Sequence, residues 1–594
     1  MRELSVPAEV TVADGERLTD MVIDNAREVP DLVSFGRRLP AGEWVDVTAA
    51  TFATEVTAAA RGLIGSGVGP GDRVALMSAT RYEWTVLDYA IWSAGAVCVP
   101  VYETSSAEQV DWILADSGAV AAVVETDAHL ALVKASSSAP DLLWTFDRLD
   151  ELAAAGARVS DAEAEQRRTA VRADDLATIV YTSGTTGRPK GCMLTHRNLL
   201  ADVKAANKAL LPVYDEAGST LLFLPLAHVF GRVIEIGSVL QRSKLGHTAD
   251  VRALPADLQA FRPTFLLAVP RVFEKVYNAA RQTAYAAGRK RVFDAAEATA
   301  IAYSRALQAG RVPPALRLRH ALFDRLVFGR IRAALGSRCT AAISGGAALG
   351  ERLGHFFRGA GITVYEGYGL TETSAGATLN LPGAIRVGTV GRPVPGGSVR
   401  IGEDGEILLR GPNVFCGYWH NRDATDEVFS DGWFRTGDLG SLSEDGTLAI
   451  TGRKKEILVT AGGKNVAPAV LEDRLRAHPL ISQCIVVGDQ KPYIAALVTL
   501  DAEMLPAWAR NHGLEGLTVD EARTHEVIRA EIQTAVDDAN KAVSRAESIR
   551  RFAILGGDFT EDNGYLTPSL KLKRSIVMKD YGAEVEALYS DPRE

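Results

Sequence analysis

The first third of the chain alternates amphipathic stretches with short apolar runs. Apolar residues spaced three and four positions apart predict helices over Leu18 to Ala26, Phe52 to Leu63 and Trp84 to Ala94. Buried strands are predicted where β-branched and other apolar residues follow one another, at residues 73–78, 96–102, 119–124 and 177–180. Strands that alternate with helices usually run parallel and are joined by crossover helices. The pattern therefore predicts an α/β fold of layered, mostly parallel sheets covered by helices.

The alternating pattern ends near residue 454, where a hairpin over Ile457 to Lys464 is predicted. A chain of 594 residues is too long for one hydrophobic core. The remainder has the size of a compact α+β domain. We therefore expect a large N-terminal domain over residues 1–453 and a small C-terminal domain over residues 454–594.

A loop rich in glycine and hydroxyl side chains follows the strand predicted at residues 177–180. It reads Tyr181-Thr-Ser-Gly-Thr-Thr-Gly-Arg-Pro-Lys-Gly191, and a helix is predicted from Leu194 onward. Its glycines allow the backbone to approach an anion, its hydroxyls add donors, and Lys190 supplies a positive charge for phosphate. The spacing differs from that of the usual P-loop. We predict a phosphate-binding loop of another kind, with an ordinary surface turn as the alternative if no partner motifs follow.

Partner motifs do follow, in order. Residues 341–348 combine a short strand with small residues that permit a flat ring to lie against the backbone. The motif Tyr365-Glu-Gly-Tyr-Gly-Leu-Thr-Glu-Thr373 offers an aromatic face at Tyr368 and a hard oxygen ligand for Mg²⁺ at Glu372. Gly432-Trp-Phe-Arg-Thr-Gly-Asp438 places an acid suited to ribose hydroxyls at Asp438. The last two are Gly452-Arg-Lys-Lys-Glu456 and Leu566-Thr-Pro-Ser-Leu-Lys-Leu-Lys-Arg574.

These motifs, spread over roughly residues 20 to 575, resemble those of the adenylate-forming enzymes, the superfamily of acyl-CoA synthetases, adenylation domains and luciferase. The segment Val269-Pro-Arg-Val-Phe-Glu-Lys275, the helical region after it and the Ser-Leu-Lys motif are most similar to long-chain fatty-acid CoA ligases. The resemblance implies ATP, Mg²⁺ and coenzyme A as cofactors and a long-chain fatty acid as substrate. The implied reaction converts ATP, fatty acid and CoA to acyl-CoA, AMP and diphosphate through an acyl-adenylate.

The resemblance also implies roles for individual residues. The implied catalytic residues are Lys571, Lys190, Glu372 and His228, and the implied Mg²⁺ ligands are Thr185 and Glu372. The implied nucleotide and coenzyme A contacts are Thr182, Ser183, Gly184, Thr185, Thr186, Gly187, Lys190, Gly345, Gly346, Ala347, Gly367, Tyr368, Gly369, Thr371, Asp438, Arg453, Gly462 and Gly463. Lys455 is the implied hinge about which the mobile small domain turns. Leu570 stands where the family usually has glycine, so Lys573 stays open as an alternative to Lys571.

His228 closes the apolar segment Leu221 to Arg232, which predicts a strand that ends in this histidine. From the residues alone, a satisfied structural histidine is the commoner outcome. The resemblance instead places His228 beside the acyl carboxylate. Arg232 lies three residues before Glu235, a helical spacing at which the two can form an ion pair.

The composition limits the class of protein, its partners and the compartment that we expect. A hydrophobic content of 47% with 23% charged residues is typical of a soluble globular protein, and the five cysteines lack a zinc or disulfide spacing. The net charge of −9 gives no indication of a nucleic-acid partner. No apolar stretch reaches the ~18 residues of a membrane span, so we expect a cytoplasmic protein, at most peripheral to the inner face of a membrane.

The basic residues are unevenly distributed along the chain. From Arg281 to Arg338 there are twelve Lys or Arg and three acids. A solvated helical face explains such a run; the alternative is a surface that meets anionic lipid or the phosphates of a coenzyme. No feature of the sequence predicts an oligomeric state.

Several related functions share these motifs. A fatty-acyl-AMP ligase that loads a carrier protein is the main alternative, although no obvious inserted segment follows Lys455. A peptide-synthetase module would continue into a carrier domain, and a luciferase-like oxygenase is distinguished only by an assay for light. A non-catalytic nucleotide-binding protein is disfavoured because Glu372, Asp438 and Lys571 are all present.

Overall fold

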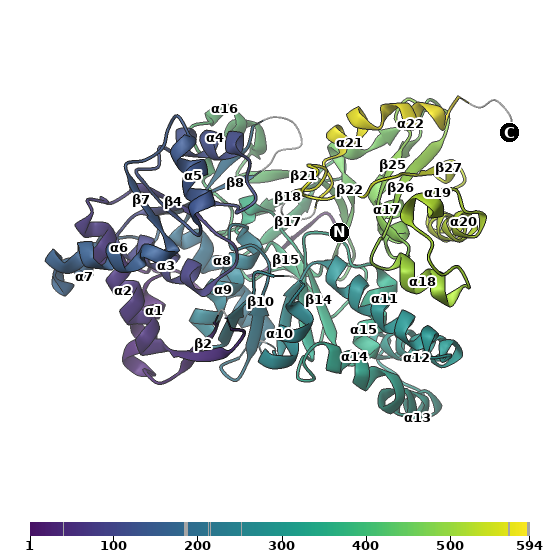
Figure 1. Ribbon diagram of the computed structural model, residues 1–594, viewed down its shortest axis with the longest axis horizontal. Coiled ribbons are helices and arrows are strands. Elements are labelled where there is room, and N and C mark those ends of the chain that lie inside the picture. The colour runs from purple at the N-terminus through teal and green to yellow at the C-terminus, as the bar shows by residue number, and fades with distance from the viewer. Residues whose placement is uncertain are drawn as a thin grey trace.

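The computed structural model describes residues 1–39, 41–182, 188–211, 213, 215–250, 252–567 and 571–590. Figure 1 shows a large N-terminal part built of several sheets with helices around them, and a smaller C-terminal part that is green to yellow in the view. The predicted fold class, an α/β protein with a large and a small domain, is confirmed.

The largest sheet of the N-terminal part has seven strands in the order β19-β9-β8-β5-β4-β6-β7. Its strands are β4 (Arg73–Met77), β5 (Val97–Val101), β6 (Ala121–Val124), β7 (Leu142–Thr145), β8 (Leu176–Thr182), β9 (Lys190–Thr195) and β19 (Gly417–Tyr418). The run from β8 to β7 is parallel, as the sequence predicts, whereas β9 and β19 are antiparallel to their neighbours.

Alternate side chains of this sheet enter two different cores. Val74 and Leu76 of β4 pack into a core that includes α2 (Ala49–Gly65) and α3 (Tyr82–Ser93). Ala75 and Met77 pack into another core that includes α4 (Ala107–Ser117) and α5 (Asp127–Ala135). Because successive residues of a strand point to opposite faces, this division shows that helices cover both faces of the sheet.

A second sheet has five strands in the order β12-β13-β14-β15-β16. They are β12 (Phe265–Ala268), β13 (Ala341–Ser344), β14 (Thr363–Tyr368), β15 (Thr378–Leu379) and β16 (Arg392–Pro393). The core on one of its faces includes residues of α11 (Pro270–Ala286), α12 (Lys290–Gln308) and α15 (Glu351–Gly359). Phe265 and Ile343 on its other face join the core of the first sheet, so the two sheets form adjoining layers.

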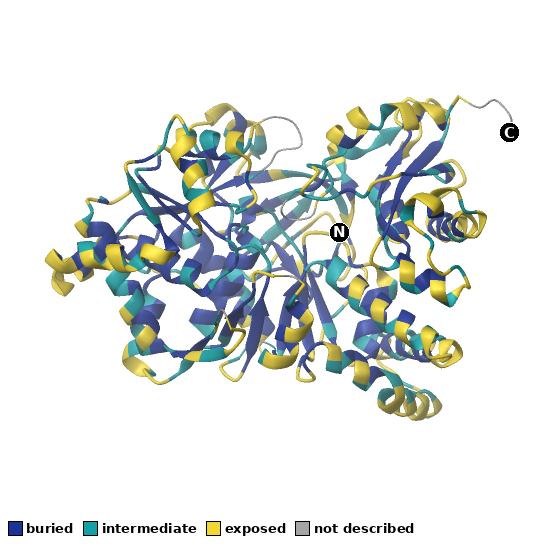
Figure 2. Ribbon diagram, viewed as in Figure 1, coloured by how far each residue is buried: buried dark blue, intermediate teal, exposed yellow. Residues whose placement is uncertain are grey.

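Two further sheets complete the large part. The four-stranded sheet contains β10 (Ser219–Leu222), β11 (Lys244–His247), β2 (Val33–Arg38) and β3 (Trp44–Thr48). The six-stranded sheet contains β1 (Glu3–Ser5), β17 (Ser398–Ile401), β18 (Glu406–Arg410), β20 (Phe429–Ser430), β21 (Trp433–Leu442) and β22 (Leu448–Arg453). The other helices of this part are α1 (Asp20–Glu28), α6 (Leu149–Ala155), α7 (Asp161–Ala170), α8 (His196–Leu210), α9 (Val229–Gln241), α10 (Leu254–Phe261), α13 (Pro314–Phe323), α14 (Gly329–Ala334) and α16 (Arg422–Val428). Figure 2 shows that the sheets are mainly buried and that the peripheral helices carry most of the exposed residues.

The sequence prediction for the segment after the glycine-rich loop was partly wrong. Residues 190–195 form strand β9, which pairs with β8 in an antiparallel hairpin, and the helix α8 begins only at His196. The apolar run Gly191 to Leu194 completes the buried sheet, and Thr195 ends it because its side chain caps the helix together with Asn198 in a capping box. Thr182 and Lys190, which flank the centre of the glycine-rich segment in the sequence, are therefore paired with each other across this hairpin.

The prediction of a strand ending in His228 was also wrong. Strand β10 ends at Leu222, and His228 is the N-cap residue of α9, where its side chain accepts a hydrogen bond from the Phe230 N–H. Pro225 lies between them and cannot continue a strand inside a sheet, because it lacks the N–H that the ladder requires.

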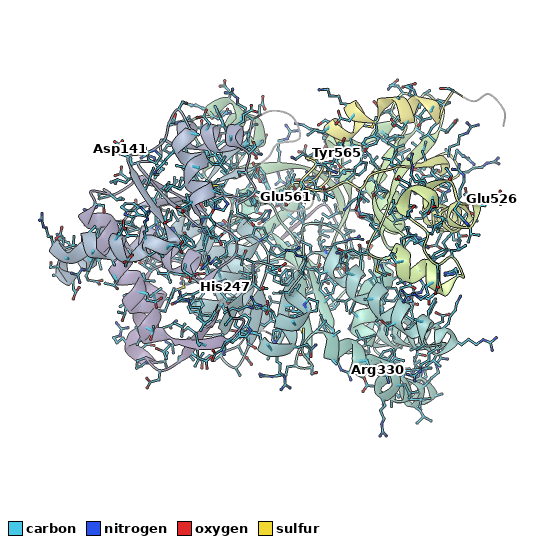
Figure 3. All side chains as sticks on the ribbon, viewed as in Figure 1. Asp141, His247, Arg330, Glu526, Glu561 and Tyr565 are labelled. Atoms are coloured by element: carbon cyan, nitrogen blue, oxygen red, sulfur yellow. The ribbon has the colours of Figure 1, made fainter. Side chains whose placement is uncertain are left out.

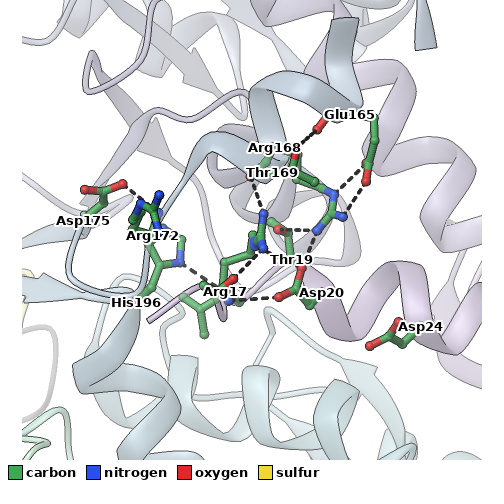
Figure 4. A network of polar contacts seen from close by, with 12 residues as sticks. Arg17, Thr19, Asp20, Asp24, Glu165, Arg168, Thr169, Arg172, Asp175 and His196 are labelled. Carbon is green, nitrogen blue, oxygen red and sulfur yellow. Dashed lines mark hydrogen bonds and ion pairs between the residues drawn. The ribbon is translucent and has the colours of Figure 1, made fainter. Parts of the chain in front are cut away.

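A polar network fastens the N-terminal segment beside the start of α8 (Figure 4). Arg168 of α7 donates to Asp20 at 2.5 Å and to Glu165 at 2.8 Å. The N–H of Leu18 donates to Nδ1 of His196, the first residue of α8. Burial, with the nearby Arg17 and Arg232, lowers the pKa of His196 to about 3, so this ring stays neutral and can accept the bond. The network thus fixes the helix that follows the glycine-rich hairpin.

The small C-terminal part has its own hydrophobic core. A sheet of β25 (Ile481–Val487), β26 (Ile494–Leu500) and β27 (Ile549–Ile554) is fully buried on one face against α17 (Pro468–Arg476) and α20 (Glu526–Asn540). Its remaining elements are β23 (Leu458–Val459), β24 (Asn465–Val466), α18 (Leu505–Asn511), α19 (Val519–Thr524), α21 (Arg574–Asp580) and α22 (Gly582–Ala587).

Polar contacts join the small part to helix α11 of the large part. Arg271 pairs with Asp501 at 2.7 Å, and Lys275 pairs with Glu503 at 2.9 Å. About two turns beyond Lys275 on α11, Gln282 accepts a hydrogen bond from Asn511 at 2.7 Å. The contact between α11 and the region of α18 is therefore polar in character at each of these points.

Candidate active site

A single large cleft of about 3020 Å³ lies between the two parts and brings most of the predicted site residues together. The predicted residues that line it are Thr182, Lys190, His228, Gly345, Gly346, Ala347, Gly367, Tyr368, Gly369, Thr371, Glu372, Asp438, Arg453 and Lys571. They come from the seven-, five- and six-stranded sheets, from the N-terminus of α9 and from the small domain, so the site exists only in the folded assembly of the two parts.

The base of the glycine-rich hairpin is held firmly. Thr182 and Lys190 face each other as the last paired residues of β8 and β9. Arg188 stacks on the ring of Trp112 at 4.7 Å, and the Trp112 indole N–H donates to the carbonyl of Pro189 at 2.9 Å. The predicted phosphate contacts Ser183, Gly184, Thr185, Thr186 and Gly187 lie outside the described residues.

Lys190 and Glu372 are linked through a tyrosine that the sequence analysis did not identify. The Tyr418 hydroxyl donates to Oε1 of Glu372 at 2.8 Å, and Nζ of Lys190 lies 5.1 Å from the centre of the Tyr418 ring. Tyr418 thereby orients the carboxylate and the ammonium group across the cleft. No signal in the sequence marks this residue, because it belongs to strand β19. This strand pairs with β9 of the seven-stranded sheet although the two are far apart in the sequence.

Glycines keep the wall of the cleft flat where backbone segments come close together. A Cβ at Gly369 would lie 1.8 Å from the carbonyl oxygen of Ala375, so no other residue fits there without a backbone shift. A Cβ at Gly345 would meet the Phe230 ring at 3.2 Å, and one at Gly367 would meet Thr378 and Leu379 at 3.1 Å. These strand ends leave a smooth surface suited to a flat ring.

The opposite wall carries a hydrogen-bonded acid. Asp438 is buried in β21; it accepts from the Tyr368 hydroxyl at 2.7 Å and pairs with Nε of Arg453 at 2.9 Å. Both partners were among the predicted residues. The arrangement places one acid, one guanidinium and one aromatic ring side by side, a set suited to a ribose and its attached base.

His228 lines the cleft at the start of α9. Its Nδ1 accepts the Phe230 N–H at 3.1 Å, which assigns the proton to Nε2. Burial, with the nearby charge of Lys571, lowers the pKa of His228 to about 3. The ring is therefore neutral and offers one N–H donor to a bound group.

Arg232, one turn into α9, forms a buried ion pair that differs from the predicted one. Its guanidinium bonds both carboxylate oxygens of Asp88, and it donates to the hydroxyl of Thr178 at 2.6 Å. The predicted pairing with Glu235 was wrong, because Asp88 takes the bidentate position instead. Thr178 lies in β8, so this pair ties the strand before the glycine-rich loop to the helix that begins at His228.

Lys571 of the small domain reaches into the same cleft. It is enclosed by protein, although solvent still reaches its side chain, and its ammonium interacts with Arg453, Asp438, Glu372 and Glu456. Enclosure and the charge of Arg453 lower the pKa of Lys571, while the three carboxylates oppose that shift. The Lys571 N–H donates to the hydroxyl of Thr567 at 3.0 Å. Lys573 also lines the cleft.

The predicted coenzyme A residues Gly462 and Gly463 lie elsewhere. They form the exposed tip of the β23–β24 hairpin and do not line the cleft. In this arrangement of the two domains, Lys571 faces the site and the glycine hairpin faces solvent.

The residues around Glu372 fit a magnesium ion that is shared with phosphates. No group of three or more His, Cys, Asp or Glu side chains within the described parts of the chain is placed to hold a metal by itself. Mg²⁺, however, is often bound by one or two carboxylates together with water and substrate phosphates. The Glu372 carboxylate, which is only partly buried and uses one oxygen for Tyr418, meets that requirement.

Glu366 is a second acid in the cleft, and the sequence predicted no role for it although it belongs to the motif Tyr365 to Thr373. Glu366 accepts from the Leu349 N–H at 3.2 Å, and burial raises the pKa of Glu366 to about 7. It thereby holds the end of the small-residue segment 345–349 against β14. The contact joins the loop after β13 to the next strand of the chain, β14, and the motif alone did not indicate this support.

Comparison with known proteins agrees with this geometry. Residues 23–419 match the AMP-binding enzyme family and residues 455–593 match the AMP-binding enzyme C-terminal domain, so the chain belongs to the AMP-binding enzyme family. It is 54% identical to the protein named long-chain-fatty-acid–CoA ligase FadD15 of Mycobacterium bovis, over 99% of this chain and 100% of that one.

Solved structures share the fold at lower identity. The anthranilate CoA ligase AuaEII in complex with anthranoyl-AMP superposes with a TM-score of 0.73 at 19% identity, over 97% of this chain and 99% of that one. The O-succinylbenzoate coenzyme A synthetase of Bacillus subtilis in complex with ATP and magnesium gives a TM-score of 0.68 at 20% identity, over 93% and 98%.

Proposed function

We propose that this protein is a long-chain fatty-acid CoA ligase that uses ATP and forms an acyl-adenylate intermediate. The observation that carries the proposal is that Lys571 of the small domain lines the same cleft as Asp438, Glu372 and Arg453 of the large domain. The relationship to the long-chain-fatty-acid–CoA ligase FadD15 over the whole chain supports the acyl substrate class.

In the first half-reaction, a carboxylate oxygen of the fatty acid attacks the α-phosphorus of ATP. The bond from that phosphorus to the β-phosphate oxygen breaks, and pyrophosphate leaves with the electron pair. Two negatively charged groups must meet in this step, so the site contributes charge neutralisation and orientation. Lys190 and the loop amides bind the phosphates, Lys571 bridges the carboxylate and the α-phosphate, and the neutral His228 donates from Nε2 to the bound acid.

Mg²⁺ would be held by Glu372 with the hydroxyl of Thr185, and when bound it supplies further neutralisation of phosphate charge. Asp438 accepts hydrogen bonds from the ribose hydroxyls, Arg453 assists it, and Tyr368 stacks on the adenine. The glycines at 345, 367 and 369 leave room for that ring, and Thr371 and the small residues Gly346 and Ala347 complete its surroundings.

In the second half-reaction, the sulfur of coenzyme A attacks the acyl carbon of the adenylate. The bond between that carbon and the phosphate oxygen breaks, AMP leaves, and the thiol loses its proton. We propose that the small domain, residues 454–594, first turns about Lys455, which withdraws Lys571 and presents the Gly462–Gly463 hairpin to the coenzyme.

The neighbourhood of Lys455 supports this hinge. Lys454 is held to the large domain by Asp404 at 2.6 Å and Glu406 at 3.2 Å, and the small-domain hairpin begins at Leu458. Lys455 itself is exposed, so its backbone can rotate without loss of packing.

Substituting Lys455 tests the hinge directly. Lys455→Pro should leave adenylation near the wild-type rate and slow thioester formation, because proline fixes φ at the point of rotation. Lys455→Ala keeps the backbone freedom and should retain both rates. Single-turnover measurement of each half-reaction checks this, and an equal loss in both half-reactions of the proline variant would contradict the hinge.

The substrate class is tested by measuring pyrophosphate release and thioester formation in parallel for acids from acetate to stearate, each with and without coenzyme A. Thioester formation should peak at long chains. Acyl-adenylate that accumulates regardless of coenzyme A would instead identify a fatty-acyl-AMP ligase that serves a carrier protein.

A peripheral contact with a membrane belongs to the same proposal, because the substrate is a lipid and the region from Arg281 to Arg338 is strongly basic. No helix among the described residues is long and apolar enough to cross a bilayer.

A further inference from the structure

Helix α13 is attached to the molecule along one side only. Its His320 ring stacks on Tyr303 of α12 with 3.8 Å between ring centres, and His320 Nε2 bonds the carbonyl of Gly359 at 2.6 Å. Arg319 donates to the hydroxyl of Thr299 of α12 at 2.7 Å. None of the residues of α13 is buried, and Figure 2 shows it at the edge of the molecule as an exposed helix.

The free side of this helix carries a row of leucines. Leu318, Leu322 and the following Leu326 are 77%, 56% and 49% exposed. Leu326 lies in the π-helix Asp324–Phe328, which continues α13. Leucines four residues apart share one helical face, and a soluble helix normally turns such a face toward the core. Here that face points to solvent, and an exposed apolar row of this kind marks an interaction site.

Arginines border the leucine row. Between residues 309 and 338 the chain has seven arginines and one acid, Asp324, which is itself paired with Arg332 at 2.7 Å. The exposed Arg317, Arg325 and Arg330 take part in no ion pair of the described residues. Arg330 is labelled at this edge in Figure 3. The surface is therefore apolar along its centre and positively charged beside it.

We propose that Leu318, Leu322 and Leu326 with Arg317, Arg325 and Arg330, the α13 patch, form a docking surface for an anionic phospholipid bilayer. The leucines enter the boundary between headgroups and acyl chains, and the arginines bind lipid phosphates. The proposed peripheral membrane contact thereby has a defined surface on the protein and a preference for negatively charged lipids. The binding itself does not depend on the proposed function, which only explains why such binding would be useful.

The positive charge of the α13 patch favours a membrane over a second copy of the chain as its binding partner. A two-fold dimer through this patch would set the same arginines face to face, since each subunit presents the same surface. With no free acid between residues 309 and 338, such a contact would gather positive charge without compensation. A bilayer that contains anionic lipid supplies both the missing negative charge and an apolar layer for the leucines.

The patch is connected to the cleft through α12. This helix packs against α13, and its residues Ile301 and Arg305 line the cleft. A membrane bound at α13 is therefore separated from the candidate active site by one helix, which suits an enzyme whose substrate is dissolved in the bilayer.

Vesicle co-sedimentation of the full-length protein, without ATP or coenzyme A, tests the proposal. The protein should bind vesicles of phosphatidylcholine with phosphatidylglycerol, bind much less to phosphatidylcholine alone, and be released as salt screens the charges. Arg317→Gln with Arg325→Gln should weaken the partition coefficient by roughly 25-fold, about fivefold for each arginine. Leu318→Ser should weaken it by about tenfold.

Matched controls come from exposed residues elsewhere. Val527→Ser, at a residue that is 45% exposed on α20, and Arg422→Gln on α16 should bind vesicles like the wild type. Unchanged thermal unfolding of each variant shows that the fold is intact. Equal binding to both vesicle types, or wild-type binding by the α13 variants, would overturn the proposal. So would a dimer in light scattering that the leucine substitution dissociates, because the patch would then join two copies. Ligase activity does not enter any of these measurements, so their failure is separable from failure of the proposed function.

Discussion

Replacing Lys571 with alanine should reduce the rate of acyl-adenylate formation by roughly 10²- to 10³-fold. Lys571 lines the same cleft as the acid of the ribose site and the carboxylate proposed for Mg²⁺, and the charges of both acids act on its ammonium. Without it, the repulsion between the two negatively charged reactants in the transition state is compensated only by Lys190 and the loop. The measurement is fatty-acid-dependent pyrophosphate release in single turnovers.

The same variant, given a preformed acyl-adenylate and coenzyme A, should form thioester at close to the normal rate, because the proposed rotation removes Lys571 before that step. Lys573→Ala is the matched control, since this lysine lines the cleft two residues away. If Lys573→Ala lost adenylation and Lys571→Ala retained it, the two roles would have to be exchanged.

Asp88→Asn should lower the free energy of unfolding of the large domain by about 3–5 kcal/mol. Asp88 and Arg232 are 0% and 1% exposed, so removal of the acid leaves a buried guanidinium without its counter-charge. Arg232 lies 5.3 Å from the ring centre of Trp84 and 5.0 Å from that of Trp92, so tryptophan fluorescence during denaturant unfolding reports directly on this region.

Asp426→Asn provides the comparison for Asp88→Asn. Asp426 pairs with Arg422 on the surface at 3.6 Å, and loss of such an exposed pair should cost less than about 1 kcal/mol. A loss of that size for Asp88→Asn as well would mean that the buried pair contributes no more than a surface pair.

The parts of this molecule that the sequence predicted are those that local pattern determines. The helix around Trp84 and the strands at 73–77 and 121–124 follow from runs of apolar residues, because a buried parallel strand must be apolar on both faces. The motif residues were predicted through family resemblance, which carries information about three-dimensional arrangement that periodicity lacks.

The errors have a common physical origin in long-range pairing. Residues 190–195 became a strand because β8 and β19 bind them on both sides, and neither partner is visible in the segment itself. Arg232 paired with Asp88, 144 residues away, in preference to the acid three positions along its helix. The role of Tyr418 depends on the same kind of contact between distant strands. A short apolar run followed by a helix does not reveal which of its residues a remote strand will bind.

The polar contacts between α11 and the small domain have a consequence for turnover. Arg271 with Asp501, Lys275 with Glu503 and Gln282 with Asn511 are polar interactions, and the exposed pair of Lys275 with Glu503 can be replaced by water at little cost. If the small domain turns once in each catalytic cycle, these contacts must be broken and remade each time. At these three points the groups that separate when the joint opens are polar, so water can form hydrogen bonds with them and the opening does not pull apolar side chains apart there.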